Sequence, residues 1–367
     1  MKIVHFSDLH LDSPFAWAGA AGEVARRRRQ ALRQVLLRIL ELTREVGADA
    51  LFCGGDLYEH DRVTPDTAEF LRTSFADLGP IPVFLAPGNH DWYGPKSVYK
   101  LVEWSSNVHI FHEPSLERLD LGDGISLWGA AHLAPANTDN FLDGFQVEGG
   151  GVHIALFHGA ERSWFTAQGG GKEPHAPFDA GQIERAGLHH CFLGHYHRPK
   201  DAARHTYPGN PDPLAFGEDG ERGAVIATIG SDGQIDRERR RVALTDVQDF
   251  GLDVTGCTTQ QQIRERLNDL LTGSEGLARL TVRGDLEPSV ELREDDLRDE
   301  MSRFDATQIR IGAVRSAYDI DTIRQEHTVR GQFVNDVLAA DLSPHEERRV
   351  LISGLRALDG RADLEVL

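Results

Sequence analysis

The sequence predicts an α/β fold in which two sheets pack against each other and carry helices on their outer faces. The first part of the chain alternates apolar runs of strand length with helical periodicity, which is typical of β-α-β units. The sequence that follows, up to about residue 245, is richer in short strand-like runs. Together these two observations indicate a layered sandwich.

Strands are expected where short apolar runs are bounded by polar residues or glycine. In order along the chain, these runs are 3–6, 50–53, 81–85, 108–111, 125–130, 152–157, 191–193, 224–229 and 239–244. Between the first two runs, Glu23–Val46 places apolar side chains at helical spacing. A second helix is expected to open at Thr64-Pro65 and to run to Ala76, because proline favours the first turn of a helix.

The pattern changes after residue 245. Strand-like runs at 249–254, 278–284 and 308–315 alternate with helical runs at 259–271 and 291–304, and helices at 331–340 and 344–358 follow. The last helix begins with a capping box formed by Ser343 and Glu346. We therefore expect a large domain over residues 1–245, a small α/β domain over 246–325 and a helical segment over 326–367.

Composition limits the class of protein. With 367 residues, 40% of them hydrophobic, the chain is long enough for one large and one smaller domain. Met1 leads directly into a strand, so we expect no signal peptide, and no apolar run approaches the about 20 residues that a bilayer span needs. The three cysteines lack metal-type spacing, and Cys53 and Cys191 fall in apolar strands. These features predict a cytoplasmic protein that makes no contact with a membrane.

Net charge bears on the substrate. The formal charge of −19 opposes simple electrostatic attraction to nucleic acid. About half of this charge lies from Val242 onward, and two bound dications would neutralise part of the remainder. The acidity therefore weakens the case for a nucleic-acid substrate without removing it.

Five short segments rich in histidine and aspartate follow strands in a fixed order. They are Asp8-Leu9-His10, Gly55-Asp56, Gly88-Asn89-His90-Asp91, His158-Gly159 and Gly194-His195-Tyr196-His197. Because α/β sheets present ligands at the carboxyl ends of their strands, these segments are expected to converge in one crevice. Their seven candidate ligands are Asp8, His10, Asp56, Asn89, His158, His195 and His197. That number suits two metal ions about 3.5–4 Å apart that share a carboxylate and clamp a phosphoryl group.

The ordered series DLH, GGD, GNHD, HG and GHYH resembles the calcineurin-like metallophosphoesterases. Within that family, HFSDLHLDSPF and YPGNPDPLAFGEDGERGAV resemble the SbcD-type DNA-repair exonucleases, which are bacterial relatives of the meiotic-recombination nuclease. The resemblance covers roughly residues 1–245. It implies a four-layer α-β-β-α sandwich core, followed by a small α/β capping domain and C-terminal helices.

Matching motif positions implies a role for each ligand. Asp8, His10 and His197 would bind the first metal, Asn89, His158 and His195 the second, and Asp56 would bridge both. Imidazole ligands favour Mn²⁺, Fe²⁺ or Zn²⁺ over Mg²⁺ and Ca²⁺, so we expect two divalent ions with Mn²⁺ as the first choice. His90 is not counted as a ligand. It is expected to be the catalytic residue that donates a proton to the leaving oxygen or stabilises its charge.

One position departs from the family. The residue three after Asp56 is usually a histidine in archaeal and eukaryotic relatives, where it helps to orient the phosphodiester, whereas this chain has Glu59. Bacterial members often carry an acidic residue there, so the departure does not exclude activity. It leaves exonucleolytic and endonucleolytic cleavage both open.

The leading interpretation is a two-metal phosphodiesterase that hydrolyses DNA in repair together with an SMC-like coiled-coil ATPase. The alternative is a metallophosphoesterase for a small nucleotide or cyclic nucleotide. A third interpretation makes the chain chiefly an assembly subunit. The long segment between Asp91 and His158 and the C-terminal third favour DNA, because a minimal small-molecule phosphoesterase needs neither. A homodimer is also retained as an oligomeric state.

Four local features have two interpretations each. The C-terminal helices either fold back on their own chain or dock the coiled coil through their apolar residues. Arg26–Arg29 is either a solvated helix face or a phosphate contact. Trp17, Trp92 and Tyr93 either pack or stack on unpaired bases. The glycine-rich segment between Trp164 and Phe178 is either a loop or a substrate flap. The apolar residues of the two C-terminal helices, 331–340 and 344–358, are Phe333, Val334, Val337, Leu338, Val350, Leu351, Leu355 and Leu358.

Overall fold

The computed structural model describes residues 1–18, 22–165 and 174–361. The chain divides into two compact units, Met1–Thr245 and Asp246–Leu367, and each unit is described by itself. Residues 166–173, which form the centre of the suggested flap, lie outside the described residues.

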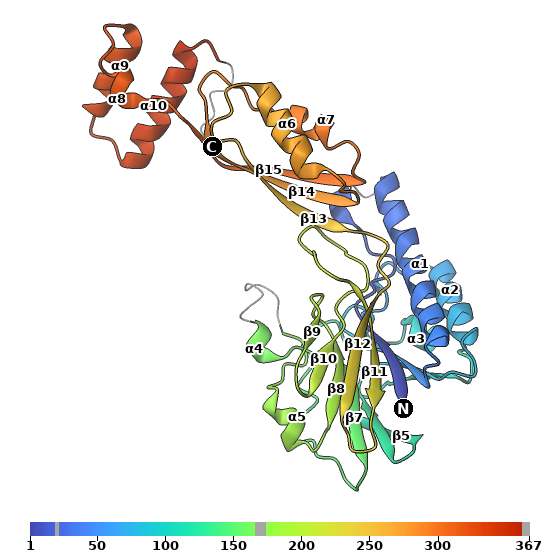
Figure 1. Cartoon of the computed structure of the whole chain (residues 1–367). Helices are drawn as coiled ribbons and strands as arrows, with labels where there is room; N and C mark the ends of the chain where they lie inside the picture. Colours follow the sequence, from blue (N-terminus) through green and yellow to red (C-terminus); the bar gives the residue numbers. More distant parts are fainter. Residues whose placement is uncertain (19–21, 166–173, 362–367) are drawn as a thin grey trace. The chain divides into compact units, whose positions relative to one another are not determined.

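The first sheet of the large unit combines parallel and antiparallel pairs (Figure 1). Its strand order is β12-β11-β1-β2-β3-β4. Strands β1 to β4 are parallel, whereas β11 is antiparallel to both of its neighbours. The strands are β1 (Lys2–Phe6), β2 (Ala50–Cys53), β3 (Val83–Leu85), β4 (Val108–Ile110), β11 (Gly223–Ile229) and β12 (Ile235–Arg241).

The second sheet has the strand order β5-β6-β7-β8-β10-β9. Its central strands β6, β7, β8 and β10 are parallel, and β5 and β9 pair antiparallel at the two edges. The strands are β5 (Glu117–Gly122), β6 (Ile125–Gly129), β7 (Val152–His158), β8 (His190–Gly194), β9 (Lys200–Asp201) and β10 (His205–Tyr207).

Four layers result from the way these sheets bury their apolar faces. Ile3 and Phe52 of the first sheet pack with Phe192 of the second in one buried cluster between the sheets. The helices α1, α2 and α3 cover the outer face of the first sheet, and α4 and α5 lie beside the second (Figure 1). These helices are α1 (Glu23–Glu45), α2 (Pro65–Ala76), α3 (Val98–Leu101), α4 (Arg162–Phe165) and α5 (Gly181–Arg185), and a short 3₁₀ helix spans Ala16–Ala18. The α-β-β-α sandwich predicted from the sequence is therefore confirmed.

Two expectations about the large unit were wrong. The last strand is Ile235–Arg241 and not 239–244, because pairing with β11 sets its ends although most of its side chains are charged. The segment between Asp91 and His158 supplies β4, β5 and β6 to the two sheets. It is thus part of the fold itself, and its length does not favour DNA over a small substrate.

The second unit begins with a parallel sheet in the order β13-β14-β15. Helices α6 and α7 pack on it through a buried cluster that includes Leu252, Leu267, Leu280 and Met301. Helix α7 is shorter than the expected 291–304, because Arg293 has extended backbone and caps its start. The elements are β13 (Val247–Asp253), α6 (Gln260–Leu271), β14 (Leu277–Leu286), α7 (Glu294–Glu300) and β15 (Ala306–Ser316).

The unit ends in three helices, α8 (Ile320–Ile323), α9 (Val329–Leu338) and α10 (Pro344–Leu358). The predicted capping box at Ser343 is confirmed. Val334, Val337, Leu351 and Leu355 are buried in a cluster shared by these helices, so this part of their apolar faces folds back on the chain itself. None of the helices in residues 1–18, 22–165 and 174–361 is long and apolar enough to cross a membrane.

Candidate metal centre

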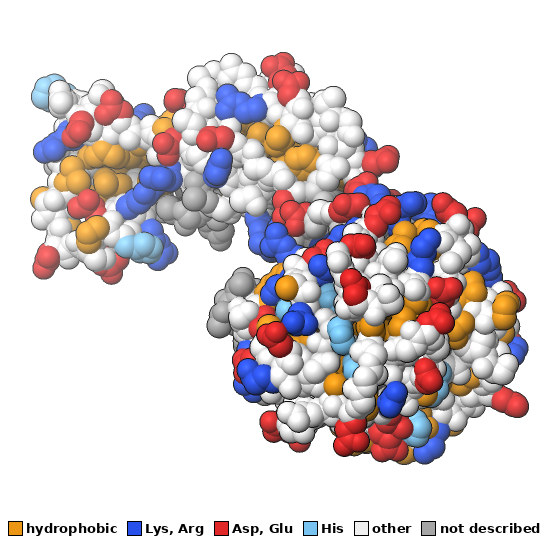
Figure 2. Space-filling view, turned by 60° about the horizontal axis from the view of Figure 1, so that its bottom comes forward, with side chains coloured by type: hydrophobic (Ala, Val, Ile, Leu, Met, Phe, Trp, Pro, Cys, Tyr) orange, Lys and Arg blue, Asp and Glu red, His pale blue; other side chains and the backbone are white. Residues whose placement is uncertain are grey.

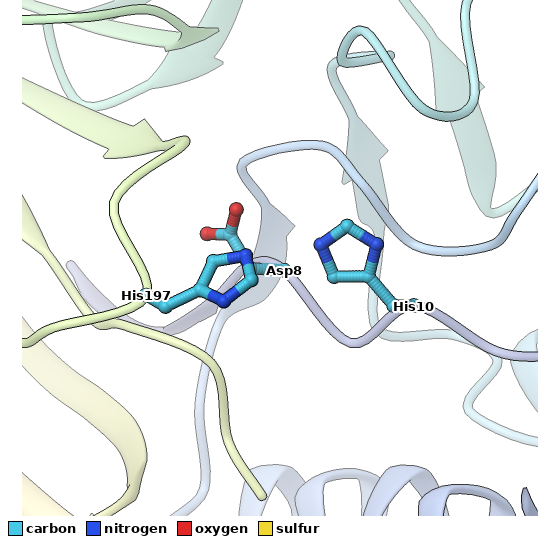
Figure 3. A group of neighbouring side chains, drawn as sticks. All are labelled: Asp8, His10 and His197. Carbon is cyan, nitrogen blue, oxygen red and sulfur yellow. The ribbon is translucent and has the colours of Figure 1, made fainter. Parts of the chain in front are cut away.

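The predicted ligands lie at the carboxyl ends of five strands, three in the first sheet and two in the second. Asp8 and His10 follow β1, Asp56 follows β2, Asn89 follows β3, His158 ends β7, and His195 and His197 follow β8. Figure 3 shows Asp8 and His10 on the loop after β1, with His197 reaching them from a separate loop. Among the described residues, three groups have ligand atoms within 4.8 Å of one another: Asp8, His10 and His197; Asp8, Asp56 and His158; and His10, Asp56 and His90.

Asp56 lies among these groups, as a bridging carboxylate should. Its Oδ2 is 3.3 Å from Nε2 of His158 and 3.7 Å from Nε2 of His10. Its Oδ1 accepts a hydrogen bond of 2.8 Å from the backbone N–H of His90. The carboxylate therefore faces one ligand from each of the two proposed metal positions.

Three buried ligand atoms have no hydrogen-bond partner among the described residues. They are His10 Nε2, Asn89 Oδ1 and His158 Nε2. His158 Nε2 forms an ion pair with Asp56 at 3.3 Å but has no hydrogen bond. A buried polar atom without a partner costs about 1–3 kcal/mol, so such atoms call for a ligand. Imidazole nitrogens beside carboxylate and amide oxygens suit divalent transition metals, and the residues therefore fit the expected pair of ions.

The other ring nitrogen of each of three histidines is fixed by an oxygen of the chain. Nδ1 of His10 lies 2.8 Å from Glu59, Nδ1 of His158 lies 2.9 Å from the carbonyl of Gly54, and Nδ1 of His197 lies 2.7 Å from Glu218. Such contacts set the tautomer and leave Nε2 for a metal. In the sequence, Glu59 stood out only as a departure from the family. Glu218 was missed, although it lies in the stretch that resembles the exonucleases.

Glu59 contacts His90 as well as His10. Its second carboxylate oxygen lies 2.9 Å from Nδ1 of His90, whose side chain is 45% exposed. Burial favours the neutral acid, but hydrogen bonds from the two histidines lower the pKa of Glu59 to about 2. Burial likewise opposes the charged ring of His90, and the bond to Glu59 outweighs it and raises the pKa to about 9. His90 is therefore protonated at neutral pH in the metal-free protein.

The ligands near the second proposed metal have opposite pKa shifts. Burial disfavours the imidazolium of His158, but the charge of Asp56 prevails and raises the pKa of His158 to about 9. Burial and the neighbouring His158 lower the pKa of His195. His195 belongs to none of the three groups above, and its ring centroid lies 5.2 Å from that of His158.

Asp91 connects the loops that carry Asp56 and Asn89. Its buried carboxylate accepts hydrogen bonds from the backbone N–H groups of Asp56, Leu57 and Gly88 at 3.1, 2.7 and 2.6 Å. Burial, together with the charge of Asp56, raises the pKa of Asp91 to about 6. One side chain thus fixes the spacing between two strands' ligand loops.

The backbone at the centre is unusually constrained. A Cβ at Gly194 would lie 2.2 Å from the carbonyl oxygen of Gly54, so the loops of the two sheets can approach only with glycine there. Asp8, His10 and Asp56 have φ angles of 54°, 51° and 53°. The left-handed region costs about 1–3 kcal/mol per residue and persists only where the surrounding structure enforces it.

Three of the basic and aromatic residues with two interpretations make contacts within the chain. Arg28 is buried and forms a 2.7 Å ion pair with Asp212, so within Arg26–Arg29 it is neither solvated nor available to a phosphate. Trp17 packs, with its Nε1 donating to the carbonyl of Leu214 at 2.9 Å. Trp92 stacks on His60 at a centroid distance of 3.8 Å.

Parts of this chain are similar to known proteins. The calcineurin-like phosphoesterase family model matches residues 1–199. The uncharacterized metallophosphoesterase YhaO of Bacillus subtilis (strain 168) is 27% identical over an alignment of 303 residues that covers 77% of this chain and 72% of that protein. The DNA double-strand break repair protein Mre11 of Methanopyrus kandleri is 27% identical over 250 residues, covering 61% of this chain and 52% of that protein.

Among solved structures, TT1561 of Thermus thermophilus aligns with a TM-score of 0.37 and 13% identity, over 65% of this chain and 98% of that chain. The family match covers more than half of the sequence and includes all seven predicted ligands. The chain belongs to the calcineurin-like phosphoesterase family.

Proposed function

We propose that this chain is a two-metal phosphodiesterase that hydrolyses DNA in repair. The observation that carries its chemistry is the set of buried, unpartnered ligand atoms on His10, Asn89 and His158 around the carboxylate of Asp56. These three atoms accept or donate no hydrogen bond within the described residues, and bound divalent ions would provide the missing partners.

Each ligand has a place in this proposal. Asp8, His10 and His197 would hold the first ion, Asn89, His158 and His195 would hold the second, and the carboxylate of Asp56 would serve both. When bound, the pair of ions polarises a phosphoryl group and activates water. The four imidazoles favour Mn²⁺ over Mg²⁺.

His90 supplies the proton for the leaving oxygen. Nearly half of its side chain is exposed, which a group that meets substrate requires. Its Nδ1 is occupied by Glu59, so Nε2 is the atom left to donate. A positioned general acid of this kind contributes about 10²–10⁴-fold to turnover.

The support for DNA as the substrate is the similarity to the archaeal Mre11, named for double-strand break repair, over 61% of this chain. The net charge of −19 and the burial of Arg28 favour the alternative, a small nucleotide, because both reduce the positive surface that DNA would meet. A direct assay must decide between the two substrates.

The assay compares linear duplex DNA, single-stranded DNA, cyclic nucleotides and bis-p-nitrophenyl phosphate in the presence of Mn²⁺. Asp56→Asn serves as the control for contaminating nucleases. We expect Mn²⁺-dependent degradation of DNA from its ends that the control lacks. Turnover of cyclic nucleotides with DNA left intact would establish the alternative.

We further propose that the C-terminal helices bind the coiled coil of an SMC-like ATPase. Hydrophobic side chains remain exposed on this unit (Figure 2), and a cavity of about 500 Å³ is lined by Phe333, Val350 and Gly354 together with polar neighbours. Val350 is 41% exposed, unlike the buried Leu351 beside it. An apolar groove of this kind accepts one face of an amphipathic helix.

The test uses Val350→Glu in the full chain and an ATPase encoded next to it in the genome. We expect the variant to lose co-purification with the ATPase while its hydrolysis of bis-p-nitrophenyl phosphate stays unchanged. Retained binding by Val350→Glu would exclude this groove as the docking site.

A further inference from the structure

Both carboxylate oxygens of Glu59 accept hydrogen bonds from histidine rings, one from the ligand His10 and one from the proposed proton donor His90. Its Oε1 lies 2.8 Å from Nδ1 of His10, and its Oε2 lies 2.9 Å from Nδ1 of His90. Each oxygen accepts a hydrogen bond from a different ring, so both oxygens are needed to hold both histidines. The rings themselves meet edge to face, with centroids 4.7 Å apart.

The bond to His10 acts on metal binding. His10 is buried, and its Nε2 is one of the unpartnered atoms at the centre. Since Glu59 accepts from Nδ1–H, the lone pair of the neutral ring is placed on Nε2, where a metal can use it.

The bond to His90 acts on the substrate side. With Nδ1 donating to Glu59, His90 can offer only Nε2–H to the leaving oxygen. As the P–O bond to that oxygen breaks, the oxygen takes the proton from Nε2. Water supplies the oxygen of the new P–O bond, and the proton that this water releases returns to Nε2.

Glu218 provides an internal comparison. It lies 2.7 Å from Nδ1 of the ligand His197, and its other oxygen accepts from Asn210 and from the backbone of Leu214. Glu218 therefore orients a first-metal ligand as Glu59 does, but it has no contact with His90 among the hydrogen bonds of the described residues.

We infer that Glu59 is a positioning residue that makes metal uptake and leaving-group protonation depend on a single side chain. This inference rests on the proposed role of His90. Glu59, where archaeal and eukaryotic relatives carry histidine, thus couples the first metal position to the proton donor.

The experiment compares Glu59→Gln, Glu218→Gln, His90→Ala and the double variant Glu59→Gln/His90→Ala in the full chain. Glutamine keeps the shape of the side chain but has one acceptor oxygen, so it can accept from only one of the two rings. Three quantities are measured: Mn²⁺ affinity by calorimetry, ¹⁵N chemical shifts of the histidine rings without metal, and turnover of two thymidine phosphodiesters at saturating Mn²⁺. One diester carries p-nitrophenol, which leaves without a proton, and the other carries methanol, which needs one.

Both glutamine variants are expected to weaken Mn²⁺ binding by about 10–100-fold. Glu59→Gln should additionally slow the methyl diester at least about 10-fold more than the nitrophenyl diester, whereas Glu218→Gln should slow both equally. This extra loss should disappear in the His90→Ala background. In the metal-free protein, Glu59→Gln should shift the ring nitrogens of His10 and His90, and Glu218→Gln only those of His197.

The outcomes distinguish a failure of the proposed role of Glu59 from a failure of the proposed role of His90. If His90→Ala slows both diesters equally, His90 is not the proton donor and the proposed function is wrong at that residue. If His90→Ala shows the leaving-group difference and Glu59→Gln does not, the inference about Glu59 is overturned. If neither diester is hydrolysed by the unaltered protein, unchanged Mn²⁺ affinity and ring shifts in Glu59→Gln would still refute it.

Discussion

Single side chains determine which atom of each ligand faces the centre. The order and spacing of the five motifs identify the ligands, because each motif follows the end of a strand. The carboxyl ends of neighbouring strands lie together at one edge of a sheet. The carboxylates behind the ligands have no such signal, since Glu59 meets His10 across 49 residues and Glu218 meets His197 across 21. Their roles follow from the fold and could not be predicted from motif spacing.

At Asp56, replacement by asparagine removes the charge that two dications would share. We expect Asp56→Asn to bind at most one Mn²⁺ ion per chain and to lose nearly all turnover. Asparagine tolerates the left-handed backbone at this position, so the variant should remain folded. Mass spectrometry measures the number of bound ions, and circular dichroism checks that the variant is folded. Two tightly bound ions in the variant would contradict the bridging role.

At His90, replacement by alanine removes the proton donor and leaves the seven ligands. Turnover of a diester with a poor leaving group should fall by about 10²–10⁴-fold. Mn²⁺ affinity, measured by calorimetry, should change little. A fall in metal occupancy as steep as the fall in rate would show that His90 is a ligand, as its place beside His10 and Asp56 allows.

Among the elements, strands with apolar runs were predictable, including β4 at a sheet edge, whereas the exact extent of strands rich in charged residues was not. β7 is buried along its whole length and was found from its apolar run. β5 and β12 are edge strands in which exposed charged residues alternate with half-buried ones, and they exist because a neighbouring strand offers hydrogen bonds. Strand pairing is a tertiary effect, and β-propensity is correspondingly dependent on context.

The close approach of the loops after β2 and β8 gives a prediction at this scale. A Cβ at Gly194 would lie 2.2 Å from the oxygen of Gly54 and 2.8 Å from Nδ1 of His158. Gly194→Ala should therefore destabilise the protein by about 1–3 kcal/mol or more and weaken metal binding. Gly150→Ala is the matched control, because nothing lies within 4 Å of its added Cβ. Equal melting temperatures for the two variants would show that the loops can separate without cost.

For the molecule as a whole, the net charge counted from the sequence does not reveal which ionisable side chains are buried. The large unit contains buried histidines that are not among the proposed metal ligands. Burial lowers the pKa of His5 and His190 to about 3 and that of His205 to about 4. His5 lies inside β1, where a packing residue is expected, and its ring does pack against Phe192.

These histidines predict acid sensitivity. Their pKa values in the folded protein lie below the unfolded value of about 6.5, so between pH 6.5 and 4 the unfolded chain binds more protons. Their contribution to stability is complete above pH 6.5 and is lost as the pH falls, by roughly 1 kcal/mol per pH unit for each histidine. Asp91, with its pKa raised to about 6, acts in the opposite direction but is one group against three.

Melting temperatures of the metal-free protein between pH 7.5 and 4.5 measure this effect. The pH dependence should be shallower in His190→Gln, which removes one titrating group. Histidines with raised pKa values, such as His158 at about 9, change protonation above pH 6.5 and do not act in this range. A melting temperature that rises on acidification would contradict the prediction.

The left-handed backbone at Asp8, His10 and Asp56 has a consequence for how this protein can evolve. Glycine adopts such angles freely, so each of these residues opposes folding locally while it serves metal binding. A lineage that no longer needs the metals is therefore under selection to replace these residues, with glycine as the favoured substitute. Among descendants of this fold, loss of activity should leave glycine-rich loops in place of the DLH and GGD motifs, and stability should increase as catalysis is lost.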